Sequence, residues 1–284
     1  MDISTPIRII TVAYNPGDEL QTFVDSLAEA TSYPYELVIC DNGQDSSVVD
    51  SVAQQCGAQV IRFGENLGYG KAINAGVAGY TGEWFVVANP DVSFEPGAID
   101  TLVNETRFWP RGGAFGPRIL TPDGKVYSSA RRFPRLITGT GHAMLQNVWE
   151  SNPFSRWYHG RNLPGHSRRT DWLSGACLLI RRKAFEEVGG FDKDYFMFFE
   201  DTQLGKDMRE ERWRSVYVPR ALVIHDTSKS WRDHPASMMK AHHESAEKYF
   251  AKTHPKPWQA PMRHIVRLGL RLHSRFELTR KNPS

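Results

Sequence analysis

The sequence predicts an α/β fold built on a mainly parallel sheet with helices on its faces. In the first part of the chain, short runs of β-branched and apolar residues alternate with segments whose apolar residues recur at helical spacing. Alternation of this kind is typical of right-handed β–α–β units and therefore of parallel strands. The chain has 284 residues, 40% of them hydrophobic and 24% charged, which is enough for one large α/β domain or two small ones.

The elements expected up to residue 88 follow one another in a regular order. Strands are predicted at residues 7–12, 36–40, 59–63 and 84–88, and helices after Asp18, from about Ser47 and after the glycine-rich turn 64–76. In the first helix, Leu20, Phe23, Val24 and Leu27 recur at helical spacing, and Asp18 can cap the N-terminus.

Polar side chains follow three of these strands directly. They are the pairs Tyr14-Asn15 and Asp41-Asn42 and the triplet Asn89-Pro90-Asp91. Ligands of open α/β sheets bind beyond the carboxyl ends of the strands. We therefore expect these side chains to meet at one edge of the sheet and to face a ligand there.

The second half of the chain is less regular. Residues from about 120 to 170 are rich in Pro, Gly, Arg and Trp, and they predict loops and short helices over the site. Regular patterns return at residues 171–182 and 184–210, and two strand-like runs follow at 215–219 and 221–225.

Four titratable residues are candidates for chemistry, and each has a structural alternative. Asp91 can ligate a divalent cation through oxygen, or it can simply open a turn behind Pro90. Glu200 and Asp201 begin a helix after four large apolar residues, where an acid can serve as a general base or as a helix cap. His225 ends a strand-like run and is either a second metal ligand or a packed side chain.

The glycine-rich turn is a poor match to a dinucleotide-binding site. Its sequence GYGKAIN contains Gly68 and Gly70, but Ile73 stands where the third glycine of that fingerprint belongs. The turn also follows the third predicted strand, whereas the fingerprint follows the first.

Seven stretches in a fixed order resemble the family 2 inverting glycosyltransferases. They are TVAYN (11–15), CDNG (40–43), NLGYGKAIN (66–74), NPDV (89–92), WLSGACLLIRR (172–182), VGGFDKDYFMFFEDTQL (188–204) and VIH (223–225), the last followed by Ser228 and Ser230. The resemblance covers residues 7 to about 231.

On the donor side, the resemblance implies a GT-A fold that binds a nucleotide-sugar. It assigns the nucleotide base to Asp41 with Ala13 and Tyr14, and further donor contacts to Asn66, Gly68, Lys71 and Asn89. It also implies Mg²⁺ or Mn²⁺ on the donor diphosphate, held by Asp91 with His225 as the candidate second ligand. The first acid of the family's usual metal motif is Asn89 here, so fewer carboxylates are available.

On the acceptor side, the resemblance makes Asp201 the general base. Trp172, Ser174, Gly175 and Glu200 would form the acceptor wall. The motifs look most like those of bacterial rhamnosyltransferases, including actinobacterial members that act on the polyprenyl-diphosphate-linked GlcNAc of the cell-wall linker, with dTDP-rhamnose as donor. A galactofuranosyl- or glucosyltransferase, or an inactive nucleotide-sugar-binding protein, stays open as an alternative.

The C-terminal residues differ in charge from the rest. Residues 262–284 contain six basic residues and one acid, whereas the remainder is slightly acidic. A helix predicted over 262–277 has Ile265, Leu268, Leu272 and Phe276 on one face and Arg263, Arg267 and Arg271 on another. We therefore expect a GT-A domain at 1–231 and a helical extension at 232–284 that contacts an anionic membrane surface. Packing of this helix on the body is the alternative.

The expected location is the cytoplasm, with peripheral attachment to the inner face of the plasma membrane. No apolar run approaches the roughly 18 residues needed to span a bilayer, and the N-terminus lacks a signal-peptide pattern. The three cysteines have no CxxC spacing, which favours a reducing compartment. No nucleic-acid partner is expected, because the body carries no basic excess, and the oligomeric state is not predicted.

Overall fold

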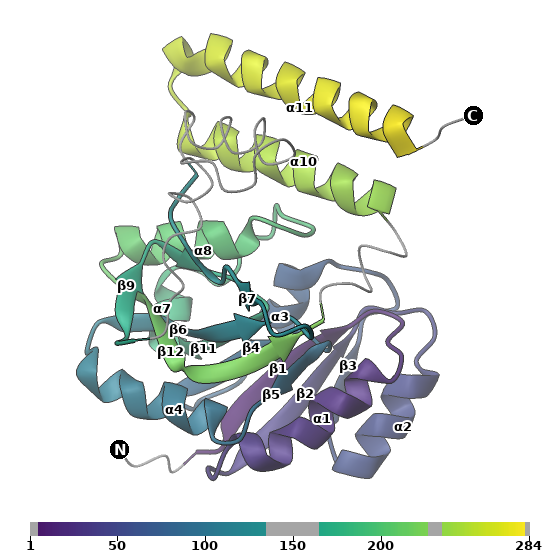
Figure 1. Cartoon of the computed structure of the whole chain (residues 1–284), viewed down its shortest axis with the longest axis vertical. Coiled ribbons are helices and arrows are strands. Elements are labelled where there is room, and N and C mark those ends of the chain that lie inside the picture. Colours follow the sequence, from purple (N-terminus) through teal and green to yellow (C-terminus); the bar gives the residue numbers. More distant parts are fainter. Residues whose placement is uncertain (1–4, 135–164, 227–234, 282–284) are drawn as a thin grey trace.

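The computed structural model in Figure 1 describes residues 5–134, 165–226 and 235–281 of the chain. Its helices are α1 (Glu19–Ala30), α2 (Ser47–Cys56), α3 (Tyr69–Val77), α4 (Ala98–Glu105), α7 (Arg182–Glu187), α8 (Glu200–Glu210), α10 (Pro235–Thr253) and α11 (Ala260–Lys281), with short 3-10 turns η1 (Thr106–Phe108) and η2 (Pro257–Gln259). Its strands are β1 (Ile7–Ala13), β2 (Tyr35–Asp41), β3 (Gln59–Arg62), β4 (Trp84–Ala88), β5 (Val92–Phe94), β6 (Gly112–Leu120), β7 (Val126–Tyr127), β8 (Ala130–Arg131), β9 (Arg168–Thr170), β10 (Trp172–Leu173), β11 (Cys177–Arg181) and β12 (Arg214–His225).

One mixed sheet forms the centre of the molecule, in the order β3-β2-β1-β4-β11-β6-β12-β5. The strands β3, β2, β1 and β4 are parallel, and so are β6 and β12. Between these two groups lies β11, which is antiparallel to both β4 and β6. The predicted mainly parallel sheet with flanking helices is confirmed, although β11 and the short strands β5, β7 and β9 are antiparallel to their neighbours.

Apolar side chains from the sheet enter two cores, one on each face. Ile7 and Ile9 of β1 pack in the same core as Leu20 of α1, whereas Ile10 packs with Ile73 of α3 on the opposite face. This alternation follows from the two-residue period of a strand, and burial on both faces explains the continuous apolar runs.

Three local expectations differ from the structure. The stretch 64–76 was expected to be a turn with a helix after it, but it contains most of α3 itself. Asp18 stands at the N-cap position of α1 but makes no side-chain capping hydrogen bond, and Glu19 instead accepts one from the backbone N–H of Gly17 at 2.8 Å. The strand-like runs 215–219 and 221–225 form a single strand, β12. Its pairing with β6 is irregular between Val218 and Leu222, around Pro219, which has no N–H to donate to a regular ladder.

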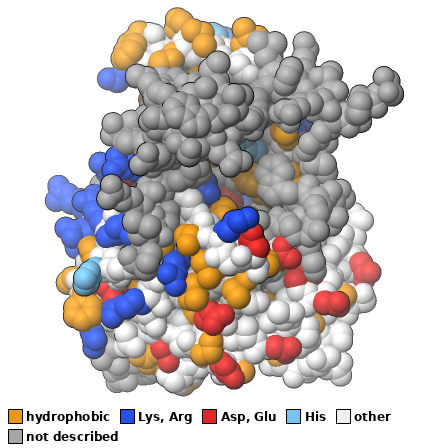
Figure 2. All heavy atoms as spheres, in the orientation of Figure 1, with side chains coloured by type: hydrophobic (Ala, Val, Ile, Leu, Met, Phe, Trp, Pro, Cys, Tyr) orange, Lys and Arg blue, Asp and Glu red, His pale blue; other side chains and the backbone are white. Residues whose placement is uncertain are grey.

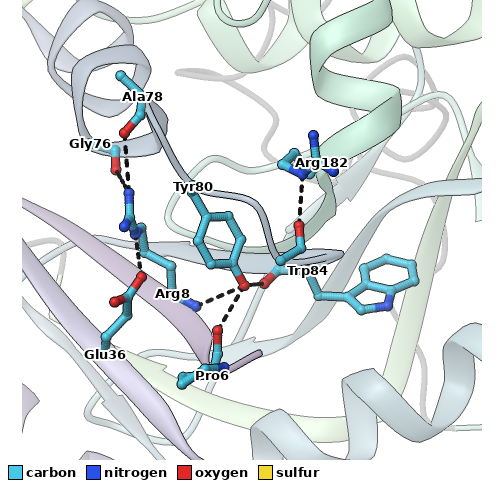
Figure 3. Close-up of polar contacts among 9 residues, drawn as sticks. Pro6, Arg8, Glu36, Gly76, Ala78, Tyr80, Trp84 and Arg182 are labelled. Atoms are coloured by element: carbon cyan, nitrogen blue, oxygen red, sulfur yellow. Dashed lines mark hydrogen bonds and ion pairs between the residues drawn. The ribbon is translucent and has the colours of Figure 1, made fainter. Parts of the chain in front are cut away.

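Polar contacts fasten the sheet at the end where β1 and β4 begin (Figure 3). The hydroxyl of Tyr80 donates to the carbonyl oxygens of Pro6 and Trp84, at 2.9 and 2.6 Å. The guanidinium of Arg8 pairs with Glu36 of β2 at 2.7 Å and also donates to carbonyl oxygens at the end of α3. Because these contacts lie at the amino ends of the parallel strands, the carboxyl ends are left for a site.

The last two helices form a hairpin beside the sheet domain (Figure 1). Arg267 of α11 pairs with Glu247 of α10, and Arg263 donates to the carbonyl oxygen of His254 at 2.8 Å. The helical extension expected from the sequence is therefore present, although the boundary expected at residue 231 lies outside the described residues. No helix in the described ranges combines the length and the apolar character needed to cross a membrane.

Candidate active site

The carboxyl ends of β1, β2, β4 and β12 bring the predicted donor-side residues to one edge of the sheet. Ala13 and Asp41 are paired in register at the ends of β1 and β2. Asn89 follows β4, and its backbone N–H donates to Ala176 at 2.9 Å. His225 ends β12, which is parallel to β6 and points to the same edge.

The loop after β2 is built around the carboxylate of Asp41, which is buried. One carboxylate oxygen accepts a hydrogen bond from the N–H of Gly43 at 2.9 Å, and the other accepts one from the hydroxyl of Ser46. A Cβ at Gly43 would lie 2.7 Å from the side-chain oxygen of Asn15 and 3.0 Å from its backbone nitrogen, so a larger residue would displace Asn15. Asp41 thus fixes the loop next to Tyr14, whose side chain is exposed, and its contact with a nucleotide base stays a prediction.

Asp91 and His225 face each other across this edge and are both largely buried. Nε2 of His225 lies 3.0 Å from Oδ1 of Asp91, yet this oxygen has no hydrogen-bond partner among the described residues. The amide nitrogen of Asn89 lies 3.3 Å from the same Nε2. Nε2 has a single in-plane lone pair, so it can accept a hydrogen bond from this amide or bind a metal, but not both at once.

These two side chains fit a divalent cation with few protein ligands. Neighbouring ligand atoms of an octahedral ion with bonds of about 2.1 Å are themselves about 3.0 Å apart, which is the separation of Oδ1 and Nε2. No cluster of three or more His, Cys, Asp or Glu side chains exists in the described part of the chain, so substrate oxygens and water would have to complete the coordination.

Asp201 stands in the first turn of α8, after two residues in the left-handed region. Phe198 and Phe199 both have φ of 66°, a conformation that is costly for bulky side chains. The carboxylate of Asp201 accepts hydrogen bonds from the N–H of Gly175 at 2.9 Å and from the N–H of Thr202 at 2.7 Å. Its orientation is therefore fixed from two sides.

Glu200, the neighbour of Asp201, is held very differently. It is 7% exposed, and its Oε2 has no hydrogen-bond partner in the part of the chain that the structure describes. Burial, together with the negative charge of Asp201, raises the pKa of Glu200 to about 8. Burial also raises the pKa of Asp201, but the N–H of Gly175 and the positive charge of Arg131 act in the opposite direction.

The predicted acceptor-side residues lie around Asp201. The indole N–H of Trp172 donates to the carbonyl oxygen of Arg132 at 3.0 Å, and the N–H of Ser174 donates to Ser129 at 2.8 Å. Gly175 lies directly beside Asp201, which its N–H binds. Trp172 packs against Gly205 of α8, the helix that begins with Glu200 and Asp201, so both ends of the segment 172–175 contact this helix.

The glycine-rich turn at the start of α3 also reaches this region. Gly68 has φ of 83°, and a Cβ there would lie 2.1 Å from the carbonyl oxygen of Phe196. Asn66 accepts a hydrogen bond from the N–H of Gly68 at 3.0 Å and so shapes the turn. Lys71 is exposed, and its charge contributes to lowering the pKa of Asp194. The donor contacts assigned to these three residues stay predictions.

Several residues of the site carried no signal in the sequence. The hydroxyl of Tyr69 donates to the carbonyl oxygen of Gly175 at 2.7 Å, and the ring of Tyr127 lies edge-on to His225. Ser245 of α10 donates to the carbonyl oxygen of Met197 at 2.7 Å, and Tyr249 packs on Phe199. Each of these contacts joins residues that are far apart in the chain. Sequence periodicity and motif spacing do not predict contacts of this kind.

Comparison with known proteins decides the family. Residues 8–189 match the family model described as "Glycosyl transferase family 2". The chain belongs to this family. It is therefore a glycosyltransferase, as its motifs indicated.

Curated family 2 relatives cover nearly the whole chain. The N-acetylglucosaminyl-diphospho-decaprenol L-rhamnosyltransferase of Mycobacterium tuberculosis is 42% identical over 94% of this chain and 91% of the relative. The rhamnosyltransferase WbbL of Escherichia coli is 25% identical over 87% of this chain and 93% of the relative.

Solved glycosyltransferase structures share the fold and support the GT-A assignment. The mannosyltransferase PcManGT of Pyrobaculum calidifontis, in complex with GDP-Man and Mn²⁺, has a TM-score of 0.58 at 20% identity, over 98% of this chain and 74% of that one. GalNAc-T7, in a structure with UDP, GalNAc and Mn²⁺, has a TM-score of 0.59 at 15% identity, over 78% of this chain and 43% of that one.

Proposed function

We propose that the protein is a metal-dependent inverting glycosyltransferase that moves L-rhamnose from dTDP-rhamnose to polyprenyl-diphosphate-linked GlcNAc in cell-wall linker biosynthesis. The observation that carries the assignment of sugar and acceptor is the 42% identity, along 94% of the chain, to a relative named as an N-acetylglucosaminyl-diphospho-decaprenol L-rhamnosyltransferase. The alternative of an inactive nucleotide-sugar-binding protein would be favoured if the acidic side chains of the site were missing. Asp91, Glu200 and Asp201 are all present, which favours an active enzyme.

The donor diphosphate would lie at the carboxyl edge of the sheet, beside Asp91 and His225. These two side chains would hold Mg²⁺ or Mn²⁺, which supplies Lewis-acid stabilisation of the leaving diphosphate when bound. The contact between their facing atoms, without a hydrogen bond to Oδ1 in the described residues, supports this role. Asn89 lies beside Nε2 and would have to release this nitrogen when the metal binds, because the nitrogen has only one lone pair.

The acceptor hydroxyl would be deprotonated by Asp201 as it attacks the sugar. Inverting transfer is a single in-line displacement, so it needs one general base and no covalent nucleophile. The two backbone N–H groups on Asp201 stabilise its charged form and aim it, which supports its assignment as the base over Glu200.

The C-terminal hairpin would attach the enzyme to the inner face of the plasma membrane, where a polyprenyl-linked acceptor is embedded. Trp258, Ile265 and Leu268 are 72%, 70% and 58% exposed. Figure 2 shows apolar side chains, in orange, across the top of the molecule over the first part of α11. Apolar groups beside basic residues are the features that bind an anionic lipid interface.

Turnover with a panel of nucleotide-sugars tests this function. The purified protein should transfer from dTDP-rhamnose to a GlcNAc-diphosphate-lipid, with far less transfer from UDP-galactofuranose or nucleotide-linked glucose, and EDTA should stop the reaction. Asp201→Asn should lower turnover by about 10²-fold or more, because an amide cannot accept the proton. It should still bind dTDP as tightly as wild type.

Three outcomes would redirect the proposal. A preferred donor other than dTDP-rhamnose would reassign the sugar but keep the family. Full turnover by Asp201→Asn would move the base, with Glu200 next in line. If Asp91→Asn binds dTDP equally well with and without Mn²⁺, and wild type does the same, the metal assignment is wrong.

A further inference from the structure

Arg131 of β8 is a cation held rigidly on the acceptor side of the site. Its guanidinium lies 5.3 Å from the ring centre of Tyr127 and 5.2 Å from that of Trp172. Nε donates to the carbonyl oxygen of Ser128 at 2.6 Å, and Nη2 donates to the hydroxyl of Tyr127 at 2.9 Å. Two aromatic rings and two hydrogen bonds therefore fix where this charge lies.

The backbone around Arg131 is fixed as firmly as its side chain. Its carbonyl oxygen accepts a hydrogen bond from Thr170 at 2.9 Å, and β8 pairs with β10 so that Trp172 lies opposite it. The N–H of Phe133 donates to the carboxylate of Asp171 at 3.0 Å. A site residue mounted in this way is preorganised for a ligand.

Arg131 lies between the proposed metal pair, Asp91 and His225, and the proposed base, Asp201. On one side, the ring of Tyr127 contacts His225 of the proposed metal pair at 6.2 Å between ring centres. On the other, Arg131 stacks on Trp172, which packs against Gly205 of α8, one turn along the helix from Asp201, and its positive charge acts to lower the pKa of the Asp201 carboxyl. The ring of Tyr127 thus stands between this cation and the proposed donor diphosphate.

Further arginines lie close to Arg131 in the fold. Arg132 is the next residue, and Arg168 and Arg169 lie on β9, whose last residue, Thr170, donates to the carbonyl oxygen of Arg131. Arg168 is half-buried, with its guanidinium 4.5 Å from the ring centre of Tyr217. Figure 2 shows basic side chains, in blue, gathered on the flank of the molecule that carries β9.

We propose that Arg131 binds the diphosphate of the acceptor, in a subsite next to the base. This inference rests on the proposed function. An acceptor sugar whose hydroxyl reaches Asp201 would carry its own diphosphate one sugar ring away, and in this proposal that diphosphate lies against Arg131. A planar guanidinium recognises phosphate oxygens with paired, charge-assisted hydrogen bonds. The subsite would distinguish a diphosphate-linked sugar from a neutral glycoside.

Two soluble acceptors that differ only in charge test the subsite. One is GlcNAc linked through diphosphate to a short alkyl chain, and the other is the neutral GlcNAc alkyl glycoside. Arg131→Gln should lose about 10- to 100-fold in kcat/KM on the diphosphate acceptor, the range expected for one charge-assisted contact, and less than about 3-fold on the neutral one. Arg131→Lys should fall between, and the KM for dTDP-rhamnose should not change.

Arg107→Gln is the matched control, because Arg107 also stacks on an aromatic ring, that of Phe108, but lies in η1 outside the site. It should leave both acceptors unaffected. If Arg131→Gln loses equal amounts of kcat/KM on both acceptors, Arg131 only stabilises the packing of the site. If the variant raises the KM for dTDP-rhamnose, Arg131 binds the donor instead. Since both acceptors are soluble and no vesicles are present, lipid headgroups contribute nothing to the difference.

Inorganic pyrophosphate gives a second measurement that does not need the glutamine variant to fold. It should compete with the diphosphate acceptor in wild type, and less strongly in Arg131→Lys. Unchanged competition in the lysine variant would overturn the subsite. Absence of turnover by wild type on either acceptor would instead mean that the proposed function has failed.

Discussion

Glu200 and Asp201 are neighbours in the sequence, but their surroundings give them opposite properties. Asp201 receives two backbone N–H groups, which stabilise a carboxylate, whereas Glu200 is buried with an oxygen that has no hydrogen-bond partner in the described ranges. Two adjacent carboxyls whose surroundings differ in this way can divide acid and base roles. Burial raises the pKa of Glu200 to about 8, so Glu200 keeps its proton at neutral pH, and the two N–H groups favour the charged form of Asp201 against the effect of its burial.

The raised pKa of Glu200 makes stability depend on pH. Between the ordinary glutamate pKa of about 4.3 and the folded value of about 8, the folded state binds more protons than the unfolded state, so stability falls as pH rises through this window. Glu200→Gln has no ionisable group at this position, so its stability does not fall with pH for this reason. Thermal unfolding should show the variant stabilised relative to wild type by at least about 1 kcal/mol at pH 9, and by much less at pH 5.

Glu210→Gln is the control for that measurement, because Glu210 is exposed on the same helix and pairs only at the surface with Lys206. Its stability should follow wild type across the pH range. Parallel curves for Glu200→Gln and wild type would mean that Glu200 is ionised in the folded protein.

Single residues were predictable from the sequence where they sit at the end of an element. Asp91 and His225 follow or end strands, and Asp201 begins a helix, so their shared edge follows from strand direction alone. Arg131 and Tyr69 were not predicted. Their partners lie about 40 and 106 positions away in the chain, and only the folded loops bring them together.

At the scale of elements, α10 acts on the site through the loop before α8. The two left-handed phenylalanines of this loop cost roughly 1–3 kcal/mol each and persist only when neighbours hold them. The ring of His242 packs on both Phe198 and Phe199, and Tyr249 packs on Phe199. Ser245 is 2% exposed and binds the backbone of Met197. The extension therefore helps to position Asp201.

Removing the Ser245 hydroxyl should loosen this loop without touching the nucleotide. Ser245→Ala leaves the carbonyl of Met197 without its donor, which costs about 1–3 kcal/mol for a buried group. We expect kcat to fall by about 3- to 10-fold, with dTDP affinity unchanged by calorimetry. Glu244→Ala, on the exposed neighbour, should retain wild-type kcat. Equal rates for the two variants would show that α10 does not position the base.

The helices and strands themselves were largely predictable, because each apolar run has a clear period. The strand Trp84–Ala88 has the predicted bounds, and the other early strands differ by one residue at one or both ends. The helices after Asp18 and from Ser47 begin where expected, but α3 begins at Tyr69, inside the stretch 64–76 that was predicted as a turn. The antiparallel direction of β11 was not predictable, since it follows a long irregular segment that fixes no crossover. The part of that segment at 135–164 lies outside the described residues, so its predicted loops and short helices stay a prediction.

At the scale of the whole molecule, the site and the exposed face of α11 belong to one body. The sheet carries the donor edge, α10 packs on the loop before the base, and α11 packs on α10 through Arg267 and Glu247. A membrane contact at α11 would hold the site at a fixed distance from the lipid surface, which suits an acceptor whose lipid chain stays embedded.

Deleting residues 262–284 tests that contact. The shortened protein should no longer sediment with anionic vesicles, because it loses the apolar face and basic residues worth about 1 kcal/mol each near the surface. Turnover should fall more on a long-chain polyprenyl acceptor than on a short soluble one. High salt should also release wild type by screening the headgroups.

The double variant Ile265→Asp, Leu268→Asp keeps the rest of the helix and should reproduce the loss of vesicle binding. A shortened protein that still sediments, or that loses activity equally on both acceptors, would make α11 a packing element.

The position of β11 also sets the order in which the chain can fold during synthesis. The first four strands of the sheet are complete by residue 88, but β4 has its other edge covered only when β11 emerges about 90 residues later. Until then, β6 has no partner among the earlier strands and β4 presents an apolar, unpaired edge. Such an edge is prone to associate with other chains. A ribosome stalled before residue 177 would therefore carry a nascent chain that needs a chaperone, although most of its donor-side residues have already been made.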